Sequence, residues 1–246
     1  MSGGATFPEA LKWSFKEMLH GENLERDFIK DLLRKLDEWL ECSCEAVYHY
    51  LLRYYLDEYY NYHYKGDERY IVGDEYLIGE ILNKREKVDI VVGPEIEPKG
   101  NDDRKRNHKK QIDVREVVEI KVGKLKDLNK FIKGNRKSDF RHYRNDICKL
   151  IRIKEKKKDV HCFLLKITHG LGEAGENEKN IGKYLEEMLN GCLHSLSESR
   201  NDQSGNKQQD RCKREEYGKY QLKLLSDGYF SSICMYHLFE VKKKEE

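Results

Sequence analysis

The sequence predicts an α/β fold in which helices cover both faces of a central sheet. Residues 117–122 (VVEIKV) are mostly β-branched and end at Gly123, as is typical of a strand. Apolar side chains fall on both faces of this segment, which indicates a central strand covered on both sides. Residues 87–93 (KVDIVVG) form a second such run, and helical apolar spacing flanks both runs. Strands that are apolar on both faces, with helices before and after them in the chain, predict a layered α/β/α domain.

The remaining elements follow from the same periodicities. Apolar residues recur at helical spacing over 8–19, 24–40, 44–62, 124–132, 140–153 and 179–196. Strands are expected at 76–82, 87–93, 117–122, 161–168 and 229–241, with a turn at 83–87. The polar segments 94–110 and 197–214 are predicted to be loops.

Composition limits the classes of protein to which the chain can belong. The 246 residues contain no apolar run long enough for a membrane helix, and the first residues lack an apolar signal core. The seven cysteines form no C-x-x-C pair, so we expect reduced thiols and an intracellular protein. No membrane partner is expected.

The basic residues are concentrated in the middle of the chain. The net charge is only +2, yet residues 99–158 contain 22 Lys and Arg against nine Asp and Glu. Such a segment suits a polyanion such as nucleic acid. The expected phosphate contacts in the loop are Arg104, Lys105, Arg106, Lys109 and Lys110. A solvated, flexible loop is the alternative.

Two acids interrupt the two apolar strands. Asp89 and Glu119 are costly to bury unless they are paired or bind a metal. Neighbouring strands can place both carboxylates at one Mg²⁺, which prefers oxygen ligands. Lys121 lies two residues after Glu119 on the same strand face, where it can hold or activate an attacking water. The alternative is an ordinary ion pair on the strand surface.

An acid on one strand followed by E-x-K on the next resembles the PD-(D/E)XK nuclease superfamily, which includes many restriction endonucleases and Holliday-junction resolvases. The resemblance covers about residues 41–170, with Val88 where the superfamily's proline would stand. It implies a restriction endonuclease-like α/β/α sandwich with a mixed central sheet, plus N-terminal helices. The implied organisation is a helical extension over 1–42, a nuclease core over 43–170, and a helix, loop and strand added to the same domain over 171–246.

The resemblance also implies a function, a metal-dependent nuclease that hydrolyses DNA, as an endonuclease rather than an exonuclease. Asp89, Glu119 and the carbonyl of Ile120 would hold Mg²⁺, for which Mn²⁺ can substitute, and Lys121 would act on the water. The superfamily's helical acid falls at Glu45, on a helix stripe shared with His49, with Glu41 in reserve. A Glu in the first turn is also favoured by the helix dipole alone.

The helix after E-x-K provides further candidates for contact with DNA. His142 and Arg144 can face nucleic acid, while Asp146 and Lys149 form an i,i+3 pair. Concerted cutting of two strands would require a homodimer. The alternatives are a non-catalytic nucleic-acid-binding protein that keeps the fold, and an unrelated α/β protein.

Overall fold

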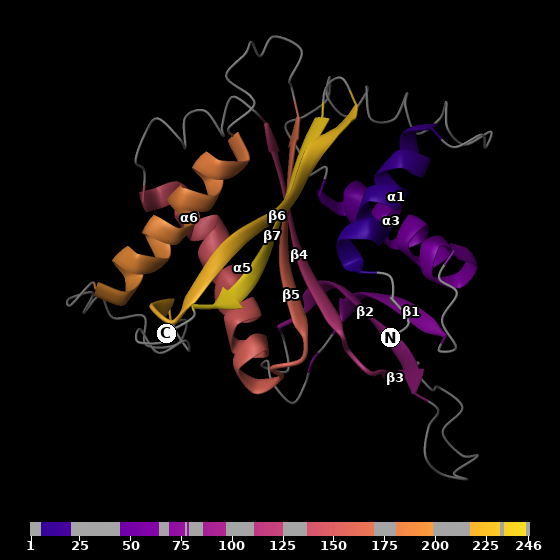
Figure 1. The fold of residues 1–246 in the computed structure, drawn as a ribbon, viewed down its shortest axis with the longest axis horizontal. Coiled ribbons are helices and arrows are strands. Elements are labelled where there is room, and N and C mark those ends of the chain that lie inside the picture. The colour runs from indigo at the N-terminus through magenta and orange to yellow at the C-terminus, as the bar shows by residue number, and fades with distance from the viewer. Residues whose placement is uncertain are drawn as a thin grey trace.

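The computed structural model is an α/β protein with a central sheet between two helical layers (Figure 1). It describes residues 6–20, 45–63, 69–76, 78, 86–96, 111–124, 137–169, 181–198, 217–231 and 234–244. The helices predicted at 24–40 and 124–132 and the loop at 197–214 lie almost entirely outside these residues.

The sheet is mixed. Its strands are β1 (Tyr70–Tyr76), β2 (Val88–Ile96), β3 (Gln111–Ile112), β4 (Glu116–Lys124), β5 (His161–His169), β6 (Tyr220–Ser231) and β7 (Cys234–Lys243). They are ordered β1-β2-β4-β5-β7-β6, and the short β3 pairs with β2. Strands β4 and β5 are parallel, and the other pairs are antiparallel. The predicted central position of the E-x-K strand, β4, is therefore confirmed.

Helices cover both faces of the sheet (Figure 1). The described helices are α1 (Phe7–His20), α3 (Glu45–Glu58), α5 (Lys137–Lys156) and α6 (Ile181–Glu198), and α3 continues into a π-helical turn, η1 (Tyr59–His63). Within the described part of the chain, no helix is long and apolar enough to cross a membrane.

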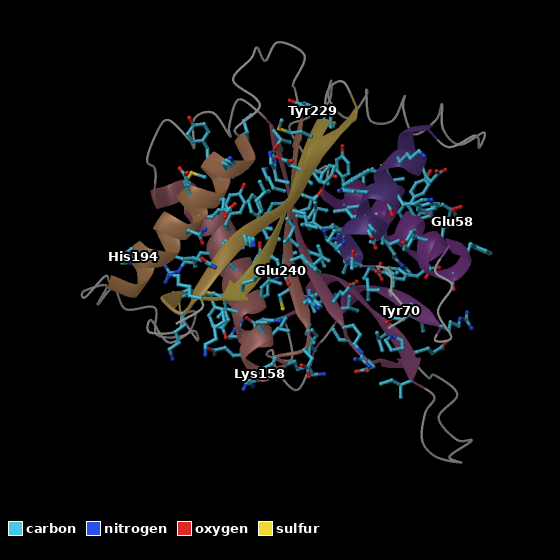
Figure 2. All side chains as sticks on the ribbon, in the orientation of Figure 1. Glu58, Tyr70, Lys158, His194, Tyr229 and Glu240 are labelled. Carbon is cyan, nitrogen blue, oxygen red and sulfur yellow. The ribbon has the colours of Figure 1, made fainter. Side chains whose placement is uncertain are left out.

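The alternation of side chains along β4 divides the core into two clusters. Val118 and Ile120 pack with Tyr48 on the side of α1 and α3. Val117 packs with Ile147 in the cluster on the side of α5 and α6. Figure 2 shows side chains filling both interfaces. Burial on both faces explains why the strand sequence is apolar on both sides.

Helix α1 is attached to the sheet by aromatic contacts and by one buried acid. Phe7 stacks on Phe163 of β5 with ring centroids 5.0 Å apart. The backbone N–H of Phe7 and the hydroxyl of Tyr60 both donate to the Glu116 carboxylate, at 3.2 and 2.9 Å. Burial raises the pKa of Glu116 to about 7, although both donors favour the ionised form.

This shift predicts that replacing Glu116 changes how stability depends on pH. The unfolded chain ionises Glu116 near pH 4.5 and the folded chain near 7, so its contribution is complete below 4.5 and is lost as pH rises to 7. The loss is about 3 kcal/mol at 1.36 kcal/mol per pKa unit. Because glutamine resembles the protonated acid, Glu116→Gln should remove this decline.

Chemical unfolding of wild type and variant at pH 5 and pH 8 measures the effect. The exposed Glu187 of α6 provides the control, because Glu187→Gln removes a carboxylate that the fold does not bury. Equal pH dependence in wild type and Glu116→Gln would contradict the assignment.

Two predicted strands are wrong in extent. The first strand was expected at 76–82, but β1 spans Tyr70–Tyr76, and Ile78, the one other residue of that run that is described, is not in a strand. A short apolar run does not show by itself whether its residues form a strand or are buried in a loop. Here Ile78 is buried among core residues without being in a strand.

The last predicted strand, 229–241, is in fact the end of one strand and most of the next. Strands β6 and β7 form an antiparallel pair whose last register pair is Ser231 with Cys234. Strand β6 begins at Tyr220, and its alternating polar residues conceal a half-buried strand. Residues 94–96, predicted to be part of a loop, extend β2.

Candidate metal centre

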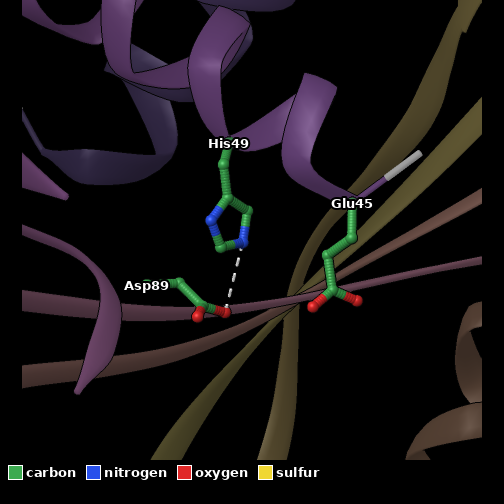
Figure 3. Close-up of side chains that lie close together, drawn as sticks. All are labelled: Glu45, His49 and Asp89. Carbon is green, nitrogen blue, oxygen red and sulfur yellow. Dashed lines mark ion pairs between the residues drawn. The ribbon is translucent and has the colours of Figure 1, made fainter. Parts of the chain in front are cut away.

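Helix α3 and strand β2 bring three metal-binding side chains together. Glu45 and His49 are four residues apart on α3 and therefore share a helix face. Their ligand atoms and a carboxylate oxygen of Asp89 all lie within 4.8 Å of one another (Figure 3). Ligands bound to one ion at about 2.0–2.2 Å lie within roughly 4.4 Å of each other, so small movements would suffice. The geometry of this group fits a divalent cation.

The position of the centre follows from the unequal lengths of two strand pairings. The register of β4 with β2 ends at Val118 and Ile90, whereas its register with β5 continues to Lys124 and His169. Beyond Val118, one edge of β4 is therefore open to side chains. The N–H of Ile120 uses this edge, donating to Asp89 Oδ2 at 2.7 Å. Ile120 thus meets Asp89 through its N–H, and metal binding by its carbonyl stays a prediction.

Asp89 is held as a charged carboxylate. Burial alone would raise its pKa, but the close contact with His49, the hydrogen bond from the N–H of Ile120 and the charges of His49 and Lys149 lower the pKa below its ordinary value. His49 Nε2 lies 3.5 Å from Asp89 Oδ2. Burial lowers the pKa of His49, but Asp89 and Glu45 raise it above its ordinary value, so the imidazole must release its proton to bind a metal.

The two residues of the E-x-K motif have different partners. Glu119 is 1% exposed, and its Oε1 lies 2.6 Å from Lys149 Nζ. Lys121 Nζ lies 2.9 Å from Asp146 Oδ2 and 3.7 Å from Glu45 Oε1. The structure thus connects Lys121 to the Glu45 group directly and places Glu119 against helix α5.

Helix α5 contributes two residues that the sequence indicated only as an i,i+3 pair. Asp146 contacts both lysines, since its Oδ1 lies 3.2 Å from Lys149 Nζ. Lys149 also donates to the carbonyl of Lys87 at 3.1 Å. Both residues fall on the stripe of α5 that faces β4, and that stripe was the available signal. His49 was likewise detectable from its i,i+4 spacing to Glu45.

The centre contains four acidic and three basic side chains. The acids Glu45, Glu119 and Asp146 lie beside the ammonium groups of Lys121 and Lys149. The fourth acid, Asp89, lies beside His49. Burial, together with the charges of Asp89 and Asp146, raises the pKa of Glu119, and Lys149 only partly opposes this. A divalent cation bound beside Glu119 would favour its ionised form, because a nearby positive charge stabilises a carboxylate.

Both lysines stay protonated at neutral pH. Burial lowers the pKa of each, but the neighbouring carboxylates more than compensate, and the pKa of Lys121 and of Lys149 is raised. For Lys121 the main compensating carboxylate is Asp146, and for Lys149 it is Glu119. The side chains of Lys121 and Lys149 are therefore positively charged groups of the centre.

The predicted DNA contacts are described only in part. Arg104, Lys105, Arg106, Lys109 and Lys110 lie outside the described residues, as does the reserve acid Glu41. His142 belongs to α5, but its side chain is not among the described ones, and Arg144 is half-buried on the same helix. Nucleic-acid contact by these residues stays a prediction.

Comparisons with protein-family models, with curated proteins and with solved structures found no match. The chemistry of the centre is therefore inferred from its own residues.

Proposed function

We propose that the chain is a metal-dependent nuclease that hydrolyses phosphodiester bonds in DNA. The observation that carries this proposal is the convergence of Glu45, His49 and Asp89 with Lys121 beside them. The order α3, β1, β2, β4, α5, β5, with β4 parallel to β5, is consistent with a restriction endonuclease-like core. An endonuclease is favoured by the superfamily resemblance.

Asp89, Glu45 and His49 would hold the ion. Carboxylate oxygens suit Mg²⁺ and Mn²⁺, whereas an imidazole ligand favours Mn²⁺ and other transition metals over Mg²⁺. We therefore expect Mn²⁺ to support activity at least as well as Mg²⁺. When bound, such an ion supplies a water of lowered pKa and polarises the phosphoryl oxygen.

Lys121 would stabilise negative charge that develops on the phosphate. Its ammonium group is kept in place by Asp146 on α5 and lies 3.7 Å from Glu45. An ammonium group that is already in position can donate a hydrogen bond to a phosphate oxygen or to the attacking water. The side chain does not have to move during the reaction. Because its pKa is raised, charge stabilisation fits Lys121 better than proton abstraction does.

The basic middle of the chain supports a polyanionic substrate. Residues 99–158 include both β4 and α5 of the centre as well as the basic loop. A positive segment next to a metal centre raises the local concentration of nucleic acid and directs its approach.

Incubation with different nucleic acids tests the proposal. Plasmid, linear, branched and single-stranded DNA, and RNA, are each exposed to the protein with Mg²⁺, Mn²⁺ or EDTA. Cleavage of DNA with a metal and none with EDTA is the expected result. Binding without cleavage of any substrate would replace the nuclease with a non-catalytic nucleic-acid-binding protein.

A further inference from the structure

The ammonium group of Lys149 occupies a cage of oxygen atoms. Glu119 Oε1 lies at 2.6 Å, Asp146 Oδ1 at 3.2 Å and the carbonyl oxygen of Lys87 at 3.1 Å. These oxygens come from β4, from α5 and from the residue that precedes β2. Three separate parts of the chain thus place oxygen atoms around one cation, as they would around a metal ion.

This cage adjoins the Glu45–His49–Asp89 group. Lys149 acts electrostatically on Asp89 as well as on Glu119. Asp146 connects the two parts, because its other oxygen contacts Lys121, which in turn faces Glu45. A cation at Asp89 and the ammonium group of Lys149 therefore repel each other and compete for the same carboxylates.

We propose that Lys149 is an internal counterion that competes with the divalent cation for Glu119 and so sets the metal concentration at which the centre fills. The inference rests on the proposed metal centre. In the metal-free chain, Lys149 stabilises a carboxylate that is almost completely buried. For Glu119 to join Asp89 as a ligand, the ammonium group must leave, and metal affinity is lowered by the cost of that displacement.

A purely structural role for the ion pair between Lys149 and Glu119 predicts a different change in metal affinity when Lys149 is replaced. If Lys149 stabilised the fold without acting on the bound ion, removing its charge would leave metal affinity unchanged, or lower it by loosening the surrounding residues. Competition predicts a gain in affinity, because a positive charge beside the ligands is removed. The sign of the change therefore separates the two roles.

Mn²⁺ titration of the full chain, followed by the electron paramagnetic resonance signal of free Mn²⁺, measures this sign. Lys149→Gln should bind Mn²⁺ at least about tenfold more tightly than wild type. Lys156 is an exposed lysine on the same helix. Its variant Lys156→Gln makes the same change in charge about 10 Å away along the helix, where screening should keep the effect within about twofold.

Thermal unfolding of Lys149→Gln, with and without Mn²⁺, shows whether the variant is folded under the conditions of the titration. Lys149→Gln should melt at a lower temperature than wild type without metal and should gain more from saturating Mn²⁺. If Lys149→Gln does not fold without metal, Lys149→Met, which fills a similar volume, provides the same titration. Equal or weaker Mn²⁺ affinity in a folded variant, or no Mn²⁺ binding by either protein, overturns the inference.

Cleavage assays on the same proteins separate this inference from the proposed function. Tighter Mn²⁺ binding by Lys149→Gln in proteins that cleave no nucleic acid would uphold the competition and end the nuclease proposal. Metal-dependent cleavage with the same Mn²⁺ requirement in wild type and variant would uphold the nuclease and overturn the competition.

Discussion

Asp89→Asn should abolish metal-dependent cleavage and most of the metal affinity. Asparagine keeps an oxygen that can accept the N–H of Ile120, so the local backbone contact is retained. The same oxygen, Oδ2, also faces His49, so the variant loses the negative charge that attracts the ion and the second carboxylate oxygen. Loss of several kcal/mol of metal-derived stabilisation corresponds to a fall of at least about 10³-fold in the single-turnover rate.

The control for this variant is Asp74→Asn. Asp74 lies on the neighbouring strand β1, is exposed, and pairs with Arg53 at 2.9 Å, so its replacement should leave cleavage and Mn²⁺ binding at wild-type levels. Wild-type Mn²⁺ affinity in Asp89→Asn would contradict the assignment of the centre.

Lys121→Ala should separate chemistry from metal binding. The variant keeps Glu45, His49 and Asp89, so its Mn²⁺ affinity should not fall. It loses the cation that Asp146 positions beside Glu45. A positioned group of this type contributes about 10²–10⁴-fold to the rate, and the loss should appear in kcat.

The matched control removes a lysine that has no connection with the centre. Lys183 is exposed on α6, and Lys183→Ala should cleave at the wild-type rate. If Lys121→Ala also cleaved at that rate while Asp89→Asn were inactive, the metal centre would stand and the E-x-K assignment would fail.

The sequence predicted the central part of the fold because its signals there are strong and redundant. Val118 and Ile120 alternate with Val117 across two apolar layers, and α5 carries apolar residues over many turns. Strand β6 has no such signal. Its polar residues interrupt the apolar pattern, and its place in the sheet depends on pairing with β7.

Which side chains meet at the centre was harder to predict, because it depends on where strand pairing stops. Glu45, Asp89 and Lys121 were expected in one site, and the structure brings them together. Glu119 is expected to share an ion with Asp89, and this stays a prediction. Its pairing with Lys149 was not predicted. That contact depends on how α5 crosses β4, and no spacing within the sequence encodes the crossing.

Crystals soaked with Mn²⁺ and measured at an anomalous wavelength test the central claim most directly. The predicted result is an anomalous peak bonded to Asp89, Glu45 and His49 at about 2.0–2.2 Å. Absence of any peak among these side chains at saturating Mn²⁺, in a folded protein, would contradict the metal centre and the nuclease built on it.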